Sequence, residues 1–207
     1  TWQINYNGAM IWDESARRPV FHKPMDGPLV REIVDATRQR YEDVLVSCEI
    51  LDRWHTDRFD PTFITETGKL FKPDVIADIA TICAQPITKL TFLGPHEVMV
   101  PLDVFLIATY GDRVATVRTD RDLIQVMDRH VGKAAALLQV CAHYGVQAEE
   151  VMAIGDAPND VGMLQLAGVA VAMDNAHPAV KQVAHWIAPS NNDHGVHAAL
   201  RRYGLCE

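Results

Sequence analysis

The last quarter of the chain alternates short apolar segments with helical patterns, and this alternation constrains the fold more than any other feature. Apolar runs at residues 151–155, 169–173 and 186–188 precede predicted helices at residues 158–167, 178–184 and 195–202. Short apolar strands that alternate with helices are typical of a parallel sheet covered on both faces. A further helix is predicted over residues 132–144, with a stop at Gly145. We therefore predict an α/β fold for this part of the chain.

The middle of the chain has a different pattern. Helices are predicted at residues 28–41, 73–84 and 101–110, and strands at residues 44–50, 88–93 and 114–118. Residues 51–72 are polar and aromatic without a clear period, which favours an extended loop or the edge of a lid. We predict that residues 26–120 form a separate α+β module, inserted into a core of residues 1–25 and 121–207.

Composition excludes several classes of protein. The formal net charge of -8, without a cluster of Lys and Arg, argues against a partner that is a nucleic acid. Apolar runs fall far short of the ~20 residues of a membrane helix, so no membrane partner is expected. Four widely spaced cysteines without a Cys-x-x-Cys pair fit reduced thiols. The first eight residues lack the basic start of a targeting segment, and we predict a cytoplasmic protein.

The run Gly155-Asp156-Ala157-Pro158-Asn159-Asp160 follows the first apolar strand of the α/β region. The carboxylate of Asp156 should leave the carboxyl edge of a parallel sheet, where open α/β folds bind ligands. Asp160 lies about one helical turn further on, with the amide of Asn159 beside it. Oxygen ligands of this kind suit Mg²⁺, which keeps most of its water. The alternative is a polar turn in which Asp caps a helix.

Lys133 stands at the predicted start of the helix that leads into the Asp156 strand, directly after Gly132. Unpaired N–H groups and the helix dipole already favour an anion at such a position. A lysine there can hold a phosphate group and reduce its repulsion by nearby carboxylates. The alternative is a solvated surface lysine, but the position one βα unit before the acidic turn favours the phosphate role.

Several blocks in this order resemble the haloacid dehalogenase superfamily, and more narrowly the Cof-type phosphatases with an inserted α+β cap of the C2B kind. The blocks are residues 131–138 (VGKAAALL), 155–164 (GDAPNDVGML), 171–176 (VAMDNA), 190–196 (SNNDHGV) and 5–13 (NYNGAMIWD). The resemblance spans nearly the whole chain. It implies a Rossmann-like parallel-sheet core, with residues 26–120 as the cap.

The resemblance also implies roles for single residues. Asp156 matches the acidic Mg²⁺ ligand, Asp160 the supporting carboxylate of that metal site, and Lys133 the phosphate-holding lysine. Asn159 matches the amide that contacts substrate or phosphate, and Asn7 is a weaker match to a residue near the phosphoryl pocket. The implied activity is Mg²⁺-dependent hydrolysis of a small phosphorylated metabolite, such as a sugar phosphate, with the cap selecting the substrate.

The nucleophile that the family uses is not found. Family members carry Asp-x-Asp-Gly-Thr at the end of the first core strand, and the first Asp forms an aspartyl-phosphate while the second is the acid and base. No Asp-x-Asp is assigned to such a strand end here, and Met25-Asp26-Gly27-Pro28 is interpreted as a turn. We expect the core to be incomplete at its N-terminus, a missing segment of the same protein to supply the nucleophile, and this chain to be inactive alone.

Two other functions stay open on these residues. A degenerate relative could keep the Mg²⁺ and phosphate ligands and act as a non-catalytic module that binds a phosphorylated ligand or a partner. A phosphomutase would need the same motifs. In the cap, Arg53, Trp54, His55 and Arg58 are candidate substrate contacts, although a solvated polar loop is the favoured interpretation.

Overall fold

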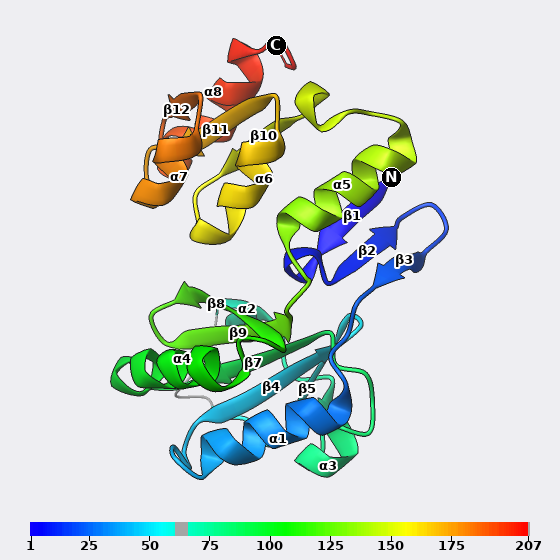
Figure 1. The fold of residues 1–207 in the computed structure, drawn as a ribbon, viewed down its shortest axis with the longest axis vertical. Coiled ribbons are helices and arrows are strands. Elements are labelled where there is room, and N and C mark those ends of the chain that lie inside the picture. The colour runs from blue at the N-terminus through cyan, green and yellow to red at the C-terminus, as the bar shows by residue number, and fades with distance from the viewer. Residues whose placement is uncertain (61–65, 207) are drawn as a thin grey trace. The chain divides into compact units, whose positions relative to one another are not determined.

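The computed structural model describes residues 1–60 and 66–206, and the chain forms two compact units (Figure 1). Unit 1 comprises residues 1 and 3–131, and unit 2 comprises Trp2 and residues 132–207. The six-stranded sheet of unit 1 runs beyond residue 120, the predicted end of the inserted module. The division into a core of residues 1–25 and 121–207 and a cap of residues 26–120 stays a prediction.

Unit 1 begins with a small sheet in the order β1-β2-β3. Its elements are β1 (Trp2–Asn5), the 3-10 turn η1 (Tyr6–Gly8), β2 (Met10–Asp13) and β3 (Arg18–His22), and β2 pairs with β3 antiparallel. The chain therefore opens with a strand that leads into a 3-10 turn.

The larger sheet of unit 1 has the order β6-β5-β4-β7-β9-β8. Its strands are β4 (Leu45–Ile50), β5 (Arg53–Thr56), β6 (Val75–Ile76), β7 (Lys89–Leu93), β8 (Val114–Asp120) and β9 (Leu123–Asp128). The helices of the unit are α1 (Gly27–Arg38), α2 (Glu66–Leu70), α3 (Ile79–Ile82) and α4 (His96–Tyr110). Buried side chains of α1, α3 and α4 share one apolar core with alternate residues of β4, β7 and β9. Because strand side chains alternate between faces, the other face of this sheet carries a different set of residues.

Two predictions in this unit are wrong. The helix expected over residues 73–84 is divided into β6 and the short α3, because Asp78 caps α3 and stops the helix from starting earlier. Its carboxylate accepts hydrogen bonds from the backbone N–H and the hydroxyl of Thr81, at 2.9 and 2.6 Å. The loop expected over residues 51–72 contains β5, and part of that loop lies outside the described residues.

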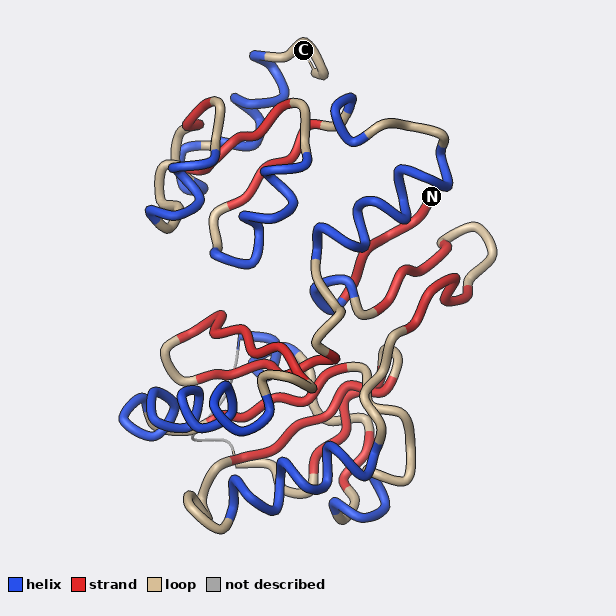
Figure 2. The backbone as a smooth tube through the Cα atoms, viewed as in Figure 1, coloured by secondary structure: helices blue, strands red, loops and turns tan. Residues whose placement is uncertain are grey.

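Unit 2 is the predicted α/β region, with three parallel strands in the order β10-β11-β12. These are β10 (Met152–Gly155), β11 (Val169–Met173) and β12 (Trp186–Ala188). The helices are α5 (Lys133–Tyr144), α6 (Val161–Leu166), α7 (Pro178–Val183) and α8 (Gly195–Arg202), with 3-10 turns η2 (Ala148–Glu150), η3 (Pro158–Asp160) and η4 (Asn191–Asp193). Figure 2 shows the strand and helix alternation. The predicted α/β class is confirmed.

Local chemistry explains how the helices of unit 2 begin and end. Gly145 ends α5 with a left-handed backbone (φ 66°), which glycine adopts without the steric cost of a Cβ. Leu164, Val180 and Ala199, from three helices, pack with strand residues in one apolar core. Trp2 stacks on His143 of α5, with ring centroids 3.5 Å apart.

All four cysteines are free thiols. Among the described residues, every helix is too short or too polar to cross a membrane.

Candidate functional site

The turn after β10 is organised by the carboxylate of Asp160. Its Oδ2 accepts hydrogen bonds from the backbone N–H groups of Asp156 and Ala157, at 3.1 and 3.0 Å. Its Oδ1 accepts a hydrogen bond from the ammonium of Lys133 at 2.5 Å. The side chain of Asp160 is 4% exposed and that of Lys133 31%. Hydrogen bonds between charged groups are among the strongest in proteins, so this carboxylate fixes both the turn and the lysine.

Gly155 makes this close approach possible. A Cβ at residue 155 would lie 2.5 Å from Cβ of Asp160 and 2.9 Å from its Oδ2. The glycine at the end of β10 is therefore needed to seat the Asp160 side chain against the strand.

Asp156 is exposed at the carboxyl end of β10, as the sequence predicted. Its backbone carbonyl accepts a hydrogen bond from the N–H of His177 at 2.9 Å, which ties the turn to the loop after β11. Asn175 in that loop accepts a hydrogen bond through Oδ1 from the N–H of Asn191 at 3.0 Å. The loops that follow all three parallel strands are thus linked at one edge of the sheet.

The structure brings four of the predicted site residues together in unit 2. Lys133 begins α5, and Asp156, Asn159 and Asp160 lie in the turn after β10. Asn7 lies in unit 1, where its amide Nδ2 donates to Oε1 of Gln125 at 2.9 Å. The expected role of Asn7 near phosphate stays a prediction.

The donor set of the turn suits Mg²⁺ in one respect. Among the described residues, the Asp156 carboxylate has no hydrogen-bond or ion-pair partner, and Mg²⁺ accepts as few as one or two carboxylates and keeps its waters. Both oxygens of Asp160 are already hydrogen-bonded, so this residue suits the supporting role better than direct ligation. Within residues 1–60 and 66–206, no three His, Cys, Asp or Glu side chains are grouped to share a metal.

The chain also contains an Asp-x-Asp run that was not considered as a nucleophile. Asp120-Arg121-Asp122 joins β8 to β9, and these strands are antiparallel. The run is followed by Leu123 and Ile124 instead of Gly and Thr. It is a hairpin turn of unit 1, so it differs from the arrangement expected of the nucleophile. Asp26 precedes α1 as its N-cap residue, which agrees with its interpretation as part of a turn.

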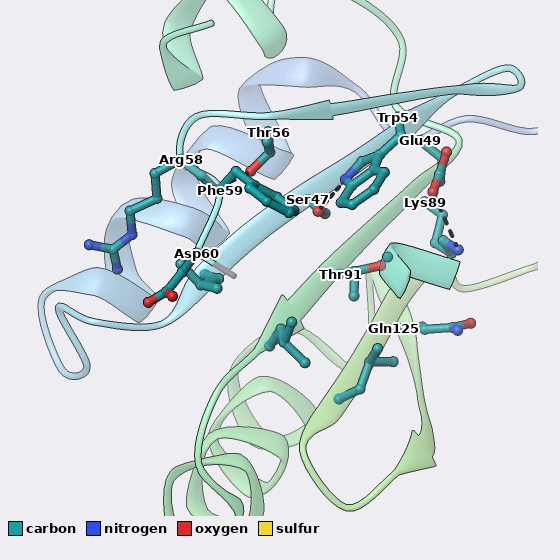
Figure 3. A pocket seen from close by; sticks show the side chains of 14 residues that line it. Ser47, Glu49, Trp54, Thr56, Arg58, Phe59, Asp60, Lys89, Thr91 and Gln125 are labelled. Atoms are coloured by element: carbon teal, nitrogen blue, oxygen red, sulfur yellow. Dashed lines mark hydrogen bonds and ion pairs between the residues drawn. The ribbon is translucent and has the colours of Figure 1, made fainter. Parts of the chain in front are cut away.

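A pocket lies in unit 1, on the face of the larger sheet opposite the apolar core (Figure 3). Its lining residues are Leu45, Ser47, Glu49, Trp54, Thr56, Arg58, Phe59, Asp60, Gly68, Lys89, Thr91, Leu93, Leu123 and Gln125. Of the candidate cap contacts, Trp54 and Arg58 line this pocket, whereas His55 is buried on the other face of β5. Glu49 and Lys89 were not predicted as site residues, although both lie on strands in which residues that face the apolar core alternate with residues that face the pocket.

Burial shifts the pKa values of two lining residues, Lys89 and Glu49. Removal from water lowers the pKa of the Lys89 ammonium, and the nearby Glu49 carboxylate opposes this shift. Removal from water raises the pKa of Glu49, and Lys89 opposes that shift in turn. Keeping the Lys89 and Glu49 side chains charged at this partly buried position therefore costs free energy.

Comparisons with known proteins agree with these features. The family model described as haloacid dehalogenase-like hydrolase matches residues 1–200. The chain is 26% identical over 209 residues to the 5-amino-6-(5-phospho-D-ribitylamino)uracil phosphatase YitU of Bacillus subtilis, with 97% of this chain and 75% of that protein covered. It is 30% identical over 149 residues to the HMP-PP phosphatase of Cronobacter sakazakii, with 71% of this chain and 55% of that protein covered.

A solved structure shows the same fold. The crystal structure of a haloacid dehalogenase-like hydrolase from Bacteroides thetaiotaomicron superimposes with a TM-score of 0.84 and 23% identity. The match covers 98% of this chain and 76% of that one. With a family match across residues 1–200, a matching fold and the GDxxND turn in place, this chain belongs to the haloacid dehalogenase-like hydrolases.

Proposed function

We propose that this protein is a Mg²⁺-dependent phosphatase that hydrolyses small phosphorylated metabolites. The observation that supports this most is the position of Asp160. Its carboxylate binds the ammonium of Lys133 and the backbone N–H of Asp156, so a cation and an exposed carboxylate lie at the same edge of the sheet. The similar proteins from B. subtilis and C. sakazakii are named as phosphatases of phosphorylated small molecules, which supports the same class of reaction.

Each residue of the turn has a separate task in this proposal. Lys133 holds the phosphoryl oxygens by charge, and Asp156 is the carboxylate that holds Mg²⁺. Mg²⁺ at this position would neutralise negative charge on the phosphoryl group. Asp160 orients Lys133 and the backbone of Asp156, and Asn159 contacts the substrate or its phosphate through the amide.

The attacking group in this proposal is an Asp outside residues 1–207. Its carboxylate oxygen bonds to phosphorus while the ester oxygen leaves with a proton from a second Asp, and water then cleaves the aspartyl-phosphate to release inorganic phosphate. The sheet position that suits such a segment is beside β10, which is an edge strand among the described strands of unit 2. Edge strands offer unpaired N–H and C=O groups to a further strand.

The test measures inorganic phosphate released from para-nitrophenyl phosphate by the natural polypeptide in the presence of Mg²⁺. We expect turnover that Asp156→Ala and Lys133→Met each reduce by about 10² or more, as for groups that stabilise charge in a transition state. Phosphate release that survives both substitutions would assign the activity to another site. Binding of a phosphorylated ligand without release would favour the non-catalytic module.

Three finer expectations belong to the same proposal. Residues 1–207 alone are expected to release no phosphate, which the same assay tests directly. The substrate is expected to be a sugar phosphate or similar metabolite, selected by the residues of the cap. A cytoplasmic location is expected because the cysteines are reduced thiols, and cell fractionation tests it.

A further inference from the structure

Both backbone groups of Asp156 are hydrogen-bonded to groups outside β10. Its N–H donates to Oδ2 of Asp160 at 3.1 Å, and its carbonyl accepts from the N–H of His177 at 2.9 Å. The first contact comes from a buried carboxylate, whereas the second comes from the loop after β11, where His177 is exposed. The direction in which the Asp156 carboxylate leaves the end of β10 therefore depends on what fixes that loop.

Asn175 attaches this loop to a third segment. The loop connects β11 to α7 (Figure 1). Oδ1 of Asn175 accepts a hydrogen bond from the N–H of Asn191 in η4 at 3.0 Å, across 16 residues of sequence. One residue, Ala176, separates Asn175 from His177, and it is only 8% exposed. A displacement of Asn175 therefore moves the N–H group of His177.

The helix α7 fixes the other end of the loop. His177 is the N-cap residue of α7, and Nδ1 of its ring accepts a hydrogen bond from the N–H of Ala179 at 3.2 Å. Val180 of the same helix is fully buried in the apolar core of unit 2. The loop is thus fixed at His177 by α7 and at Asn175 by η4.

The turn η4 is itself firmly built. Oγ of Ser190 donates to Oδ2 of Asp193 at 2.5 Å, and the carbonyl of Ser190 accepts from the N–H groups of Asp193 and Gly195, at 3.0 and 3.1 Å. A Cβ at residue 195 would lie 1.9 Å from the carbonyl oxygen of Pro189 and 2.7 Å from Cε of Met173, so the end of the turn packs closely against β11. A turn closed in this way is a suitable anchor for a neighbouring loop.

The simpler alternative is that Asn175 only shapes its own surface turn. An asparagine in that role bonds to the backbone about two residues further on. Asn175 instead bonds to a different loop, beyond both β12 and α7 in the chain. The contact therefore favours a link between loops at the carboxyl edge of the sheet.

We propose that Asn175 is a positioning residue for Asp156: its amide oxygen attaches the loop after β11 to η4, so that the N–H of His177 holds the carbonyl of Asp156. The inference rests on the proposed function in that the Asp156 carboxylate is taken as the Mg²⁺ ligand. Residues that orient a metal ligand without touching the metal commonly change metal affinity when they are replaced.

The first experiment measures hydrogen exchange of single backbone amides in the natural polypeptide by NMR. In Asn175→Ala, the protection of the Asn191 and His177 amides should each fall about fivefold or more, which is the effect of about one hydrogen bond. Asn175→Asp keeps an oxygen at the accepting position and should restore both. Asn192→Ala, an exposed asparagine of the same turn, is the matched control and should change neither.

A second variant removes the same hydrogen bond from its donor side. Asn191 is the first residue of η4, and Ser190 before it has an extended backbone (φ -64°, ψ 166°), so Asn191→Pro is compatible with the turn. The His177 amide should lose protection about fivefold or more in this variant too. The thermal unfolding midpoint of each variant shows whether it is folded. Unchanged protection of His177 in folded Asn175→Ala and Asn191→Pro proteins would overturn the inference.

The second experiment measures phosphate release from para-nitrophenyl phosphate by the natural polypeptide as a function of Mg²⁺ concentration. Asn175→Ala should raise the concentration for half-maximal release about tenfold or more. Turnover at saturating Mg²⁺ should fall less, because excess metal refills a weakened site. A variant that is merely less stable would not shift the half-maximal concentration. Asn192→Ala should behave as the unaltered protein does.

The two experiments separate this inference from the proposed function. An unchanged Mg²⁺ requirement in Asn175→Ala, with normal release by the unaltered protein, overturns the role of Asn175 and leaves the phosphatase proposal in place. Absence of release by the unaltered protein rejects the phosphatase proposal. In that case the exchange of the His177 amide still decides whether Asn175 fixes the loop that binds Asp156.

Discussion

The ammonium of Lys133 lies 2.5 Å from Oδ1 of Asp160, although 27 residues separate them in the chain. This contact joins the first residue of α5 to the turn after β10. The other oxygen of the same carboxylate holds the backbone N–H groups of Asp156 and Ala157. One buried side chain thus positions both the cation and the exposed carboxylate of the proposed phosphate site.

Asp160 and Asp156 should respond differently to substitution. Asp160→Ala leaves two backbone N–H groups and Lys133 without their acceptor, so we expect the free energy of unfolding to fall by about 2–4 kcal/mol. Asp156→Ala removes an exposed side chain, and should change the free energy of unfolding by less than about 0.5 kcal/mol while it lowers turnover by about 10² or more. Urea unfolding of both variants measures the contrast. Equal stability losses would contradict the organising role of Asp160.

Gly155 should be intolerant of a methyl group. In Gly155→Ala the new Cβ would meet Cβ of Asp160 at 2.5 Å, so the side chain must move and we expect a loss of about 1–3 kcal/mol. Gly132→Ala is the matched control, because no atom lies within 4 Å of its added Cβ and its φ of -176° is open to any residue. The unfolding midpoints of the two variants should differ clearly, and a tolerated Gly155→Ala would show that the turn can shift freely.

A bidentate ion pair in unit 1 directly precedes three residues that line its pocket. Arg38 of α1 binds both oxygens of Asp57, at 2.5 and 2.9 Å, just before the lining residues Arg58, Phe59 and Asp60. Arg38→Met should lower the free energy of unfolding by about 1–3 kcal/mol, because Asp57 would be left without its partner. Arg38→Lys should restore only part of this free energy, because lysine cannot donate to both carboxylate oxygens as the planar guanidinium does.

A matched control lies on the same helix. Arg31 pairs with Asp35 in an exposed contact, and Arg31→Met should lower the free energy of unfolding far less than Arg38→Met does. Chemical unfolding followed by circular dichroism compares the Arg31 and Arg38 variants. If both cost the same, the Arg38 pair contributes no more than a surface pair.

His22 should make stability depend on pH. Burial lowers its pKa below the ordinary 6.5, and its Nε2 contacts Oγ1 of Thr88 at 2.8 Å. The unfolded chain therefore binds a proton more readily than the folded chain. The stabilisation is present above the unfolded pKa and is lost as pH falls through the lowered folded pKa.

The measurement compares thermal unfolding midpoints at about pH 7.5 and about pH 5.5 in the natural sequence and in His22→Gln. The decrease at the lower pH should be smaller in the variant. An identical decrease in both proteins would assign the pH dependence to other groups.

Much of unit 2 could be predicted from the sequence. The strands at residues 152–155, 169–173 and 186–188 appear where apolar runs predicted them, because a strand buried in a parallel sheet must be apolar along its length. The end of α5 at Gly145 could be predicted from the residue itself, because the left-handed backbone at this position favours glycine. Asp156 was placed correctly at the strand end by the same local pattern.

Elements that depend on distant partners were missed. β6 pairs with β5 through residues far from it in sequence, and its two residues carry no period of their own. β9 lies between β7 and β8 in the sheet and was not predicted, although it carries four buried residues. Short strands gain their stability from neighbours, and a single sequence does not show which neighbours they will have.

The sequence by itself determined the parallel α/β class of unit 2, the start of α7 at Pro178, the end of α5 at Gly145, and the chemical types gathered after β10. The helix predicted from Pro158 begins only at Val161, after a 3-10 turn. Only the tertiary structure decided that the Asp160 carboxylate binds Lys133 and the backbone N–H groups of the turn, and that Glu49 lies between Trp54 and Lys89 on neighbouring strands. The physical reason is that local patterns fix backbone conformation. The partner of a side chain depends on which distant segments pack beside it.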